Sequence, residues 1–486
     1  MIPAPIGEVR HHPDPPQPRH ARWPILAAVA LSVLLRVPFL VTGLSTDEGG
    51  YAYVAQQWSR GERLYDTAWL DRPQGLLITY RALLWINDSG WTIRLGMVLA
   101  GAVITVSLGV IGWLLVSRRV GVAAAWTYAV VGVAPHLEGI TLNGELLASV
   151  PSTVSIALIV IWWRQRRSWR WLAGAGLLAG LALTMKQSGI DGIVVGLVVL
   201  VLAARGLIRT AGVFLAAAAA PLLACVLHGI AVGWSRYWTA LVGYQLSALG
   251  GSGSNTSTRW SDLSDQIGSV ALDLTLILVV SCFGWRVLNR GGRWLAGAWL
   301  FAGFVGINLG GSYWPHYFVQ PLPVLVLLVA AALVAMRSAG WQRVLGAVVV
   351  LPTLIWLVAL IPMSANQRAR TIPYDALAAR DDRIAAVIKA STAPTDQIYV
   401  LESEAYLYFA AQRTSPYPYL WGKPIDKIPD ALPRLRAMLT AAARPTLVIL
   451  DTPPAAVDPS GGIAVDLARY YHADTVVDGV PILRAN

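Results

Sequence analysis

The sequence is poor in charge, since only 13% of its 486 residues are Asp, Glu, Lys or Arg, against about 25% in a typical soluble domain. Hydrophobic residues make up 56% of the chain, and its mean hydropathy is +0.55. A single water-soluble core cannot bury that much apolar material. The composition therefore excludes a soluble enzyme along the whole length and excludes a disordered chain.

Other sequence signals are missing too. The two cysteines, Cys225 and Cys282, lie in apolar runs and form no disulfide framework or zinc motif. The first 22 residues are rich in Pro, His and Arg and have no apolar segment of their own, so we expect a polar tail and not a cleavable signal. No glycine-rich phosphate fingerprint is present, so no nucleotide site is expected.

Long apolar stretches dominate what remains, and each is long enough to span a bilayer. We place about eleven such spans, at residues 24–44, 91–116, 120–136, 143–163, 170–185, 190–204, 210–232, 267–285, 294–311, 317–336 and 342–362.

Arginine clusters follow every second span and also precede the first. The positive-inside rule then puts the N-terminus and these loops in the cytoplasm. Loops 45–90 and 233–266, and everything after residue 363, would face the outside of a plasma or inner membrane. The net charge of +11 is therefore a topology signal, and nucleic acid is not an expected partner.

The C-terminal composition changes to that of a small α/β domain. We expect a helix at 375–390, strands at 397–401 and 445–451, a helix at 432–443, and a hairpin at 470–484. The predicted fold is thus a polytopic α-helical membrane protein with three parts: a cytoplasmic tail (1–23), a transmembrane domain (24–363) and an extracytoplasmic α/β domain (364–486).

The first external loop carries the strongest signal. Its apolar residues predict two amphipathic helices lying on the membrane surface. The first has one apolar face, formed by Tyr51, Val54, Ala55 and Trp58. The second has Pro73 in its first turn and an apolar face formed by Leu76, Leu77, Tyr80, Leu83 and Leu84.

Two acids precede the first of these helices. Ser45 and Glu48 have the spacing of a capping box, so Glu48 is either a cap or a catalytic acid. Asp47 has no such structural explanation, and a carboxylate at the membrane boundary is costly without a partner or a role. It is the candidate general base for deprotonating an acceptor hydroxyl.

The residues Asp47-Glu48, Tyr51-Ala52, Gly61, Leu64-Tyr65-Asp66 and Arg72-Pro73 resemble the first external loop of the protein-mannosyltransferase and lipid A aminoarabinose-transferase group. Three later segments resemble that group in the same order: Thr141–Leu147, Leu183–Gly189, and Trp314–Tyr317 followed by Gln320–Pro323. The resemblance covers roughly residues 25–340. The chain departs from it at Gln74, where the group has a second proline, and at Glu145, where Asp is common.

The resemblance implies a GT-C fold and sugar transfer from a polyprenyl-phosphate donor with inversion of the anomeric centre. Asp47, Glu48 and Glu145 are then the catalytic candidates, and Tyr51, Tyr65 and Asn143 the substrate-cavity candidates. Donor-phosphate contacts would come from Arg72, Lys186, His316 and Tyr317.

Several of these roles have a structural alternative. Arg72 can grip phosphate with two donors, and Lys186, the first lysine of the chain, is either a phosphate contact or an interfacial anchor. His316 and Tyr317 are also ordinary interface residues. Glu145 follows a predicted Asn143 N-cap, where the helix dipole favours an acid.

Metal binding stays open: His136, Glu138 and Glu145 could hold a divalent ion with Asp47, although nothing fixes their spacing. Asp273, inside an apolar run, suggests a function without identifying one.

The sequence thus predicts a membrane glycosyltransferase whose sugar donor is linked to a lipid. The acceptor would be an extracytoplasmic glycan, lipid or protein, and arabinofuranosyl and mannosyl donors are both open. The alternative is a transporter, flippase or scaffold for lipid-linked sugars. A transporter would gather polar residues at the midplane of paired halves, whereas here they gather at the outer boundary.

Overall fold

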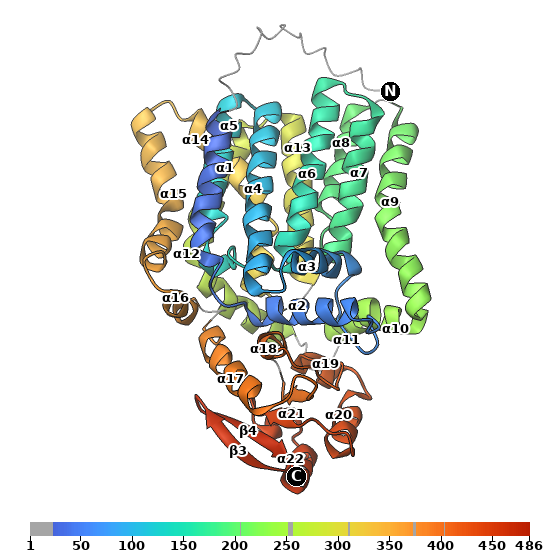
Figure 1. The fold of residues 1–486 in the computed structure, drawn as a ribbon. Helices are drawn as coiled ribbons and strands as arrows, with labels where there is room; N and C mark the ends of the chain where they lie inside the picture. Colours follow the sequence, from blue (N-terminus) through green and yellow to red (C-terminus); the bar gives the residue numbers. More distant parts are fainter. Residues whose placement is uncertain (1–22, 205, 251–255, 310–311, 373–375, 403) are drawn as a thin grey trace.

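The computed structural model describes residues 23–486 except 205, 251–255, 310–311, 373–375 and 403. A bundle of long helices forms one end of the molecule and a small α/β part forms the other (Figure 1). The N-terminal end of α1 lies at the far end of the bundle from the α/β part. The predicted cytoplasmic tail falls almost entirely outside the described residues.

Each predicted span coincides with a helix. The bundle consists of α1 (Trp23–Arg36), α4 (Gly90–Leu115), α5 (Arg118–Val131), α6 (Gly144–Gln165), α7 (Trp169–Met185), α8 (Asp191–Ala203), α9 (Leu207–Val232), α12 (Thr256–Val287), α13 (Arg290–Leu309), α14 (Leu322–Ala335) and α15 (Ala339–Leu360). Stretches of α4, α6, α9, α12 and α15 are long and apolar enough to cross a membrane by length and composition alone. The chain is therefore a mostly helical membrane protein, and the number of spans remains a prediction.

Proline corrects two of the predicted boundaries. The span expected at 24–44 ends as an α-helix at Arg36 and continues only as the short turn η2 (Val37–Phe39), because Pro38 lacks an N–H and disfavours helix in the residue before it. The span expected at 317–336 begins at Leu322, next to Pro321. Residues 315–319 form a separate turn, η5 (Pro315–Val319).

Glycine permits a close contact between α7 and α9 in the bundle. A Cβ at Gly176 or Gly180 of α7 would lie 2.1 Å from the carbonyl oxygen of Phe214 or 2.0 Å from that of Ala218, both in α9. This spacing of small residues lets two membrane helices approach backbone to backbone.

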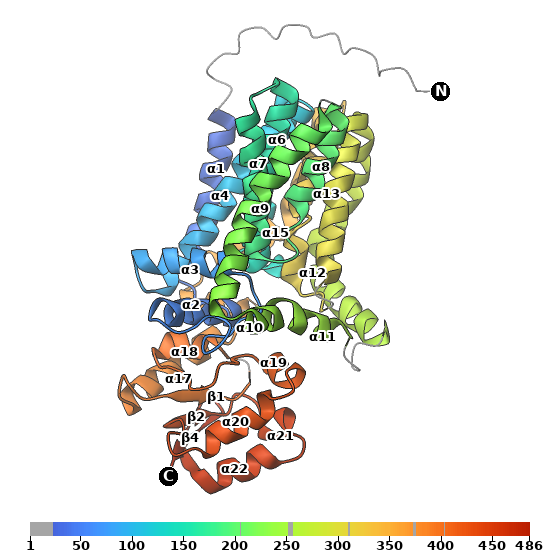
Figure 2. The ribbon, with the colours of Figure 1, turned by 90° about the vertical axis from the view of Figure 1, so that its right-hand side faces the viewer.

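A layer of shorter helices lies between the bundle and the α/β part (Figure 2). It contains α2 (Thr46–Ser59), α3 (Gln74–Ile86), α10 (Trp234–Trp238), α11 (Tyr244–Gly250) and α16 (Ala365–Thr371). Two further turns are η3 (Pro135–Leu137), between α5 and α6 in the chain, and η4 (Thr239–Gly243), between α10 and α11.

The prediction that α2 lies on the membrane surface is wrong. Residues 48–57 of α2 are buried on all sides, because α18 (Tyr406–Ala411) packs against this helix from the α/β part. A Cβ at Gly49 would lie 2.5 Å from the ring of Tyr406, so glycine permits this contact. By contrast α3 is amphipathic as predicted, with Leu76 and Tyr80 buried and Trp85 89% exposed.

The α/β part contains a four-stranded sheet in the order β1-β2-β4-β3. Strands β1 (Ile398–Val400) and β2 (Leu447–Ile449) are parallel, with Tyr399 opposite Val448. Strand β4 (Val480–Ala485) runs antiparallel to both β2 and β3 (Tyr471–Val477). The predicted hairpin is present, and its turn at Asp478-Gly479 has positive φ at both residues (49° and 83°), as tight hairpins require.

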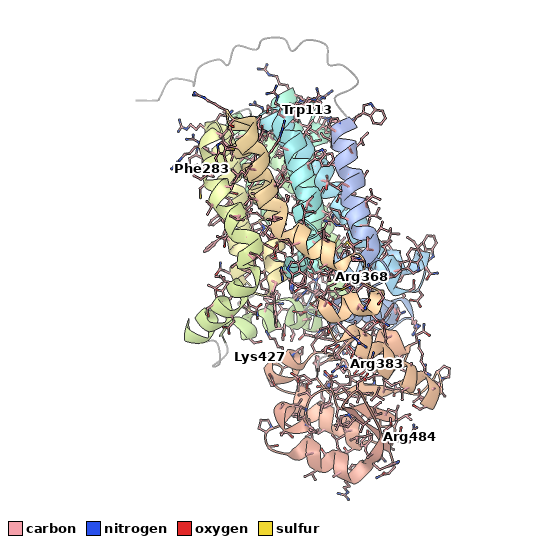
Figure 3. The ribbon with its side chains drawn as sticks, turned by 90° about the vertical axis from the view of Figure 1, so that its left-hand side faces the viewer. Trp113, Phe283, Arg368, Arg383, Lys427 and Arg484 are labelled. Carbon is pink, nitrogen blue, oxygen red and sulfur yellow. The ribbon has the colours of Figure 1, made fainter. Side chains whose placement is uncertain are left out.

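Helices flank this sheet, and the expected helices near 375–390 and 432–443 are among them. They are α17 (Ala378–Ser391), α18, α19 (Gly422–Lys427), α20 (Ala431–Thr440), α21 (Pro454–Val457) and α22 (Gly462–Tyr470). Arg368 lies at the junction with the bundle, and Arg383 and Arg484 lie in the α/β part (Figure 3).

Candidate active site

The start of α2 places the two adjacent acids in different surroundings. The predicted capping box is present: Ser45 caps the helix, and Glu48 accepts a hydrogen bond from the backbone N–H of Ser45 at 3.1 Å. The other carboxylate oxygen of Glu48 accepts from the N–H of Leu142 at 2.7 Å. Arg94 forms an ion pair with the first oxygen, Oε2. Glu48 is fully buried, so its geometry fits the capping alternative and gives it no free oxygen for catalysis.

Asp47 is only half-buried. Its Oδ2 accepts a hydrogen bond of 3.2 Å from the hydroxyl of Tyr51, one helical turn further on. Among the described residues, no Lys, Arg or His is within ion-pair distance of it, yet its charge acts on both Arg72 and Lys186. Asp47 is thus a carboxylate held by a phenol and facing two cations.

Hydrogen bonds hold the loop that carries Arg72. Tyr65 adopts a φ of +69°, and its hydroxyl donates to the carbonyl oxygen of Arg72 at 3.1 Å. The guanidinium is paired with Asp71, whose Oδ2 also accepts from Gln245 at 2.8 Å. The Nε of Arg72 is shielded from solvent and has no hydrogen-bond partner among the described residues. Tyr65, predicted in the substrate cavity, therefore contacts the backbone that carries Arg72.

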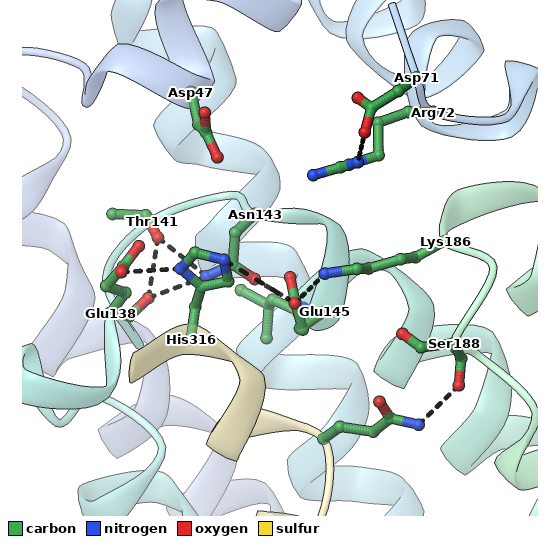
Figure 4. Close-up of polar contacts among 12 residues, drawn as sticks. Asp47, Asp71, Arg72, Glu138, Thr141, Asn143, Glu145, Lys186, Ser188 and His316 are labelled. Atoms are coloured by element: carbon green, nitrogen blue, oxygen red, sulfur yellow. Dashed lines mark hydrogen bonds and ion pairs between the residues drawn. The ribbon is translucent and has the colours of Figure 1, made fainter. Parts of the chain in front are cut away.

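The side chain of Lys186 points into the site, toward Glu145 (Figure 4). Lys186 caps the C-terminus of α7, forms an ion pair with Glu145 and lies 4.3 Å over the ring of Tyr317. Its side chain is only 12% exposed, so it is not an anchor that reaches out to the interface. Asn143 is the N-cap of α6 as predicted, accepting from the N–H of Leu146 at 2.8 Å. Glu145 is thereby placed in the first turn of that helix.

His316 lies between two acids. Its Nδ1 is 2.7 Å from Oε1 of Glu138, and its Nε2 is 3.8 Å from Oε1 of Glu145. Burial by itself would lower the pKa of His316, but the charges of Glu138 and Glu145 outweigh burial and raise this pKa above its ordinary value. The imidazole is therefore held toward its protonated, cationic form.

The segments that resemble the transferase group meet in space. Gln320 donates to the carbonyl oxygen of Ser188 at 2.8 Å and to Asp191 at 2.7 Å, which joins the later two segments. Asp47 and Arg72 point across the site toward a row formed by Glu138, His316, Glu145 and Lys186 (Figure 4). The arrangement offers one weakly held carboxylate and three basic groups to a ligand.

Two residues that the sequence singled out, the possible metal ligand His136 and the unassigned Asp273, pair with each other. His136 pairs with Asp273 at 2.8 Å instead of joining Glu138 and Glu145, and Thr353 also contacts Asp273. Asp273 is thereby explained as a buried link between helices. In the described part of the chain, no group of three His, Cys, Asp or Glu side chains is placed to hold a metal ion.

Sequence reasoning missed the acidic partners Asp71 and Glu138 in their observed roles. Asp71 adjoins Arg72 directly, which was an available signal. Glu138 and His316 are 178 residues apart, so nothing local in the sequence links them.

Comparison with known proteins identifies the fold. Residues 73–230 match the family described as dolichyl-phosphate-mannose-protein mannosyltransferase. A search of curated proteins finds no match.

Among solved structures, ArnT from Cupriavidus metallidurans bound to undecaprenyl phosphate has a TM-score of 0.68 at 16% identity, covering 95% of this chain and 98% of that one. The archaeal oligosaccharyltransferase AglB from Archaeoglobus fulgidus, in complex with an inhibitory peptide and a dolichol-phosphate, has a TM-score of 0.56 at 11% identity, covering 93% and 73%. The arabinofuranosyltransferase AftD from Mycobacteria has a TM-score of 0.53 at 15% identity, and the match covers 96% of this chain and 42% of that one. The chain therefore has the GT-C fold of membrane glycosyltransferases, as the sequence predicted.

Proposed function

We propose that the protein transfers a sugar from a polyprenyl-phosphate donor to an extracytoplasmic glycan, lipid or protein, with inversion at the anomeric carbon. The observation that carries this proposal is the half-buried Asp47, which faces the cations Arg72 and Lys186. The solved neighbours include one bound to undecaprenyl phosphate and one bound to a dolichol-phosphate, which supports a lipid-phosphate donor.

In the proposed step, Asp47 takes the proton of an acceptor hydroxyl as that oxygen attacks the anomeric carbon. The bond between this carbon and the phosphate oxygen breaks, and its electron pair stays on the phosphate. Lys186 and Arg72, whose Nε has no hydrogen-bond partner in the described part of the chain, stabilise the charge that develops there. Tyr51 orients Asp47 through its 3.2 Å hydrogen bond.

The remaining residues of the row position these groups. Glu145 holds Lys186 in place until the donor phosphate arrives, and Glu138 keeps His316 oriented and cationic. Glu48 and Asn143 fix the helix ends that carry Asp47 and Glu145. Tyr317 supplies the aromatic face under Lys186.

The proposed location is the plasma or inner membrane, with the N-terminus cytoplasmic and residues 364–486 outside as a separate α/β domain over the transmembrane domain of residues 24–363. Support comes from the position of the α/β part, which lies next to α2 and opposite the N-terminal end of α1 (Figures 1 and 2).

The test reconstitutes the purified protein in liposomes with arabinofuranosyl and mannosyl polyprenyl phosphates and a membrane extract as acceptor source. A sugar-bearing product formed by the wild type and lost in Asp47→Asn supports the proposal. Glu62→Gln is the matched control, because Glu62 is an exposed acid of the same external loop. Movement of the donor lipid across the bilayer without any product would instead support the transporter or flippase alternative.

A further inference from the structure

Trp421, which precedes α19 in the α/β part, lies beside the proposed base. Its ring centroid is 6.1 Å from that of Tyr51, with the planes tilted by 42°. The hydroxyl of Tyr51 is in turn hydrogen-bonded to Asp47. One aromatic side chain therefore separates the indole from the carboxylate that would deprotonate the acceptor.

A glycine in α2 makes room for this indole. A Cβ at Gly50 would lie 2.4 Å from Cζ2 of Trp421, so any side chain there would displace the ring. Positions 47, 50 and 51 share one face of the helix, because residues three and four apart are neighbours on a helix surface. Trp421 consequently covers the face of α2 that carries Asp47.

Within the residues that the structure describes, the indole N–H of Trp421 has no hydrogen-bond partner. Its Nε1 is shielded from solvent and donates to no protein oxygen among the described residues, while the residue as a whole keeps some exposure. A buried tryptophan N–H ordinarily finds a hydrogen-bond acceptor. The missing acceptor is therefore one that a ligand can supply.

The same short segment also contacts the opposite side of the site. Lys423 donates to the hydroxyl of Ser312 at 2.9 Å and lies 5.7 Å over the ring of Trp314, and these residues lead directly into η5 with His316. Residues 421–423 thus connect α2, which carries Asp47, with the turn that carries His316.

We propose that Trp421 binds the acceptor and that the acceptor is a carbohydrate, an inference that rests on the proposed transfer reaction. The apolar C–H face of a sugar ring packs on the indole, one of its hydroxyls accepts the free N–H, and another meets Asp47. Ligand sites typically combine such an aromatic surface with a few placed polar groups. An acyl chain would fill the aromatic surface but would leave the N–H unpaired.

The test uses the purified full-length chain with a donor lipid that the wild type accepts. The acceptor probes are octyl α-mannoside, octyl α-arabinofuranoside, a Ser/Thr-containing peptide and diacylglycerol. Trp421→Ala removes the ring and the N–H, whereas Trp421→Phe keeps an aromatic ring and removes only the N–H. Trp85→Ala, at an 89% exposed tryptophan of α3, is the matched control.

We expect the wild type to glycosylate an octyl glycoside, and the acceptor KM to rise by at least about tenfold in Trp421→Ala and by less in Trp421→Phe. The affinity for undecaprenyl phosphate should stay unchanged in both, which separates acceptor binding from damage to the donor site. If Trp421→Ala fails to fold, Trp421→Phe alone decides, through its acceptor KM.

An unchanged acceptor KM in the Trp421 variants would overturn the inference while leaving the proposed function intact. Transfer to the peptide or to diacylglycerol in place of the glycosides would overturn the acceptor class. A wild type that transfers sugar to no probe and to no component of a membrane extract would remove the proposed function, and the inference with it.

Discussion

Glu48 and Arg94 form an ion pair in which Oε2 and Nη2 are 3.0 Å apart and neither side chain is exposed. Arg94 also donates to the carbonyl oxygens of Gly43 and Ile140. Arg94 and Glu48 therefore tie α4 to the start of α2, which carries Asp47, and to the loop before α6, the helix that carries Glu145.

Breaking this pair should destabilise the protein. Arg94→Met leaves a buried carboxylate without its counter-ion, which typically costs about 3–5 kcal/mol of unfolding free energy. Arg60→Met, at an exposed arginine of the same layer, should have little effect. Unfolding in detergent followed by tryptophan fluorescence measures both, and a loss of about 1 kcal/mol or less for Arg94→Met, the range of a surface pair, would contradict the assigned role.

Lys186→Met should weaken donor binding. A hydrogen bond to a charged group contributes about 1.5–3 kcal/mol, which corresponds to an affinity about 10- to 100-fold lower. The Kd for undecaprenyl phosphate measures this, with Lys389→Met, at an exposed lysine of α17, as the control. An equal affinity in wild type and Lys186→Met would show that this lysine serves only as the partner of Glu145.

The burial of Glu404 in the α/β part should make stability depend on pH. The hydroxyl of Thr46 lies 2.9 and 3.0 Å from the two carboxylate oxygens of Glu404. Burial, and then the charge of nearby Asp381, raise the pKa of Glu404 to about 9 from an ordinary 4.5. Arg380 and Asp451 also belong to this cluster.

The folded chain therefore keeps a proton that the unfolded chain releases. The stability that Glu404 contributes is fully present below about pH 4.5 and is lost progressively as the pH rises to about 9. Glu404→Gln should flatten the dependence of the thermal midpoint on pH across that window. A variant whose midpoint follows pH as steeply as that of the wild type would contradict this assignment.

Much of the architecture followed from periodicity and charge. Long apolar runs located the bundle helices, and short continuous apolar runs located β1 and β2, because burial constrains local sequence strongly. Helix ends were less predictable where proline decided them, as at Pro38 and Pro321. The surface position expected for α2 failed because its burial depends on α18, which lies some 350 residues further along the chain.

In the site too, local contacts could be predicted from the sequence, whereas contacts between distant segments could not. The caps at Ser45 and Asn143 were predictable because they are local side-chain contacts. The pairing of Glu138 with His316 and of Glu145 with Lys186 depends on how distant helices pack, which spacing along the chain does not encode. Trp421 was missed altogether because its surroundings exist only after the α/β part packs on α2.

The most direct test of the account compares sugar transfer by wild type, Asp47→Asn and Glu48→Gln from the same polyprenyl-phosphate donor. Loss of a general base typically lowers the rate by about 10²–10⁴-fold. We expect this loss in Asp47→Asn, with unchanged affinity for undecaprenyl phosphate, while Glu48→Gln loses stability first and retains more of its rate per folded molecule. Full transfer by Asp47→Asn would contradict the central claim and would point to Glu145 as the base.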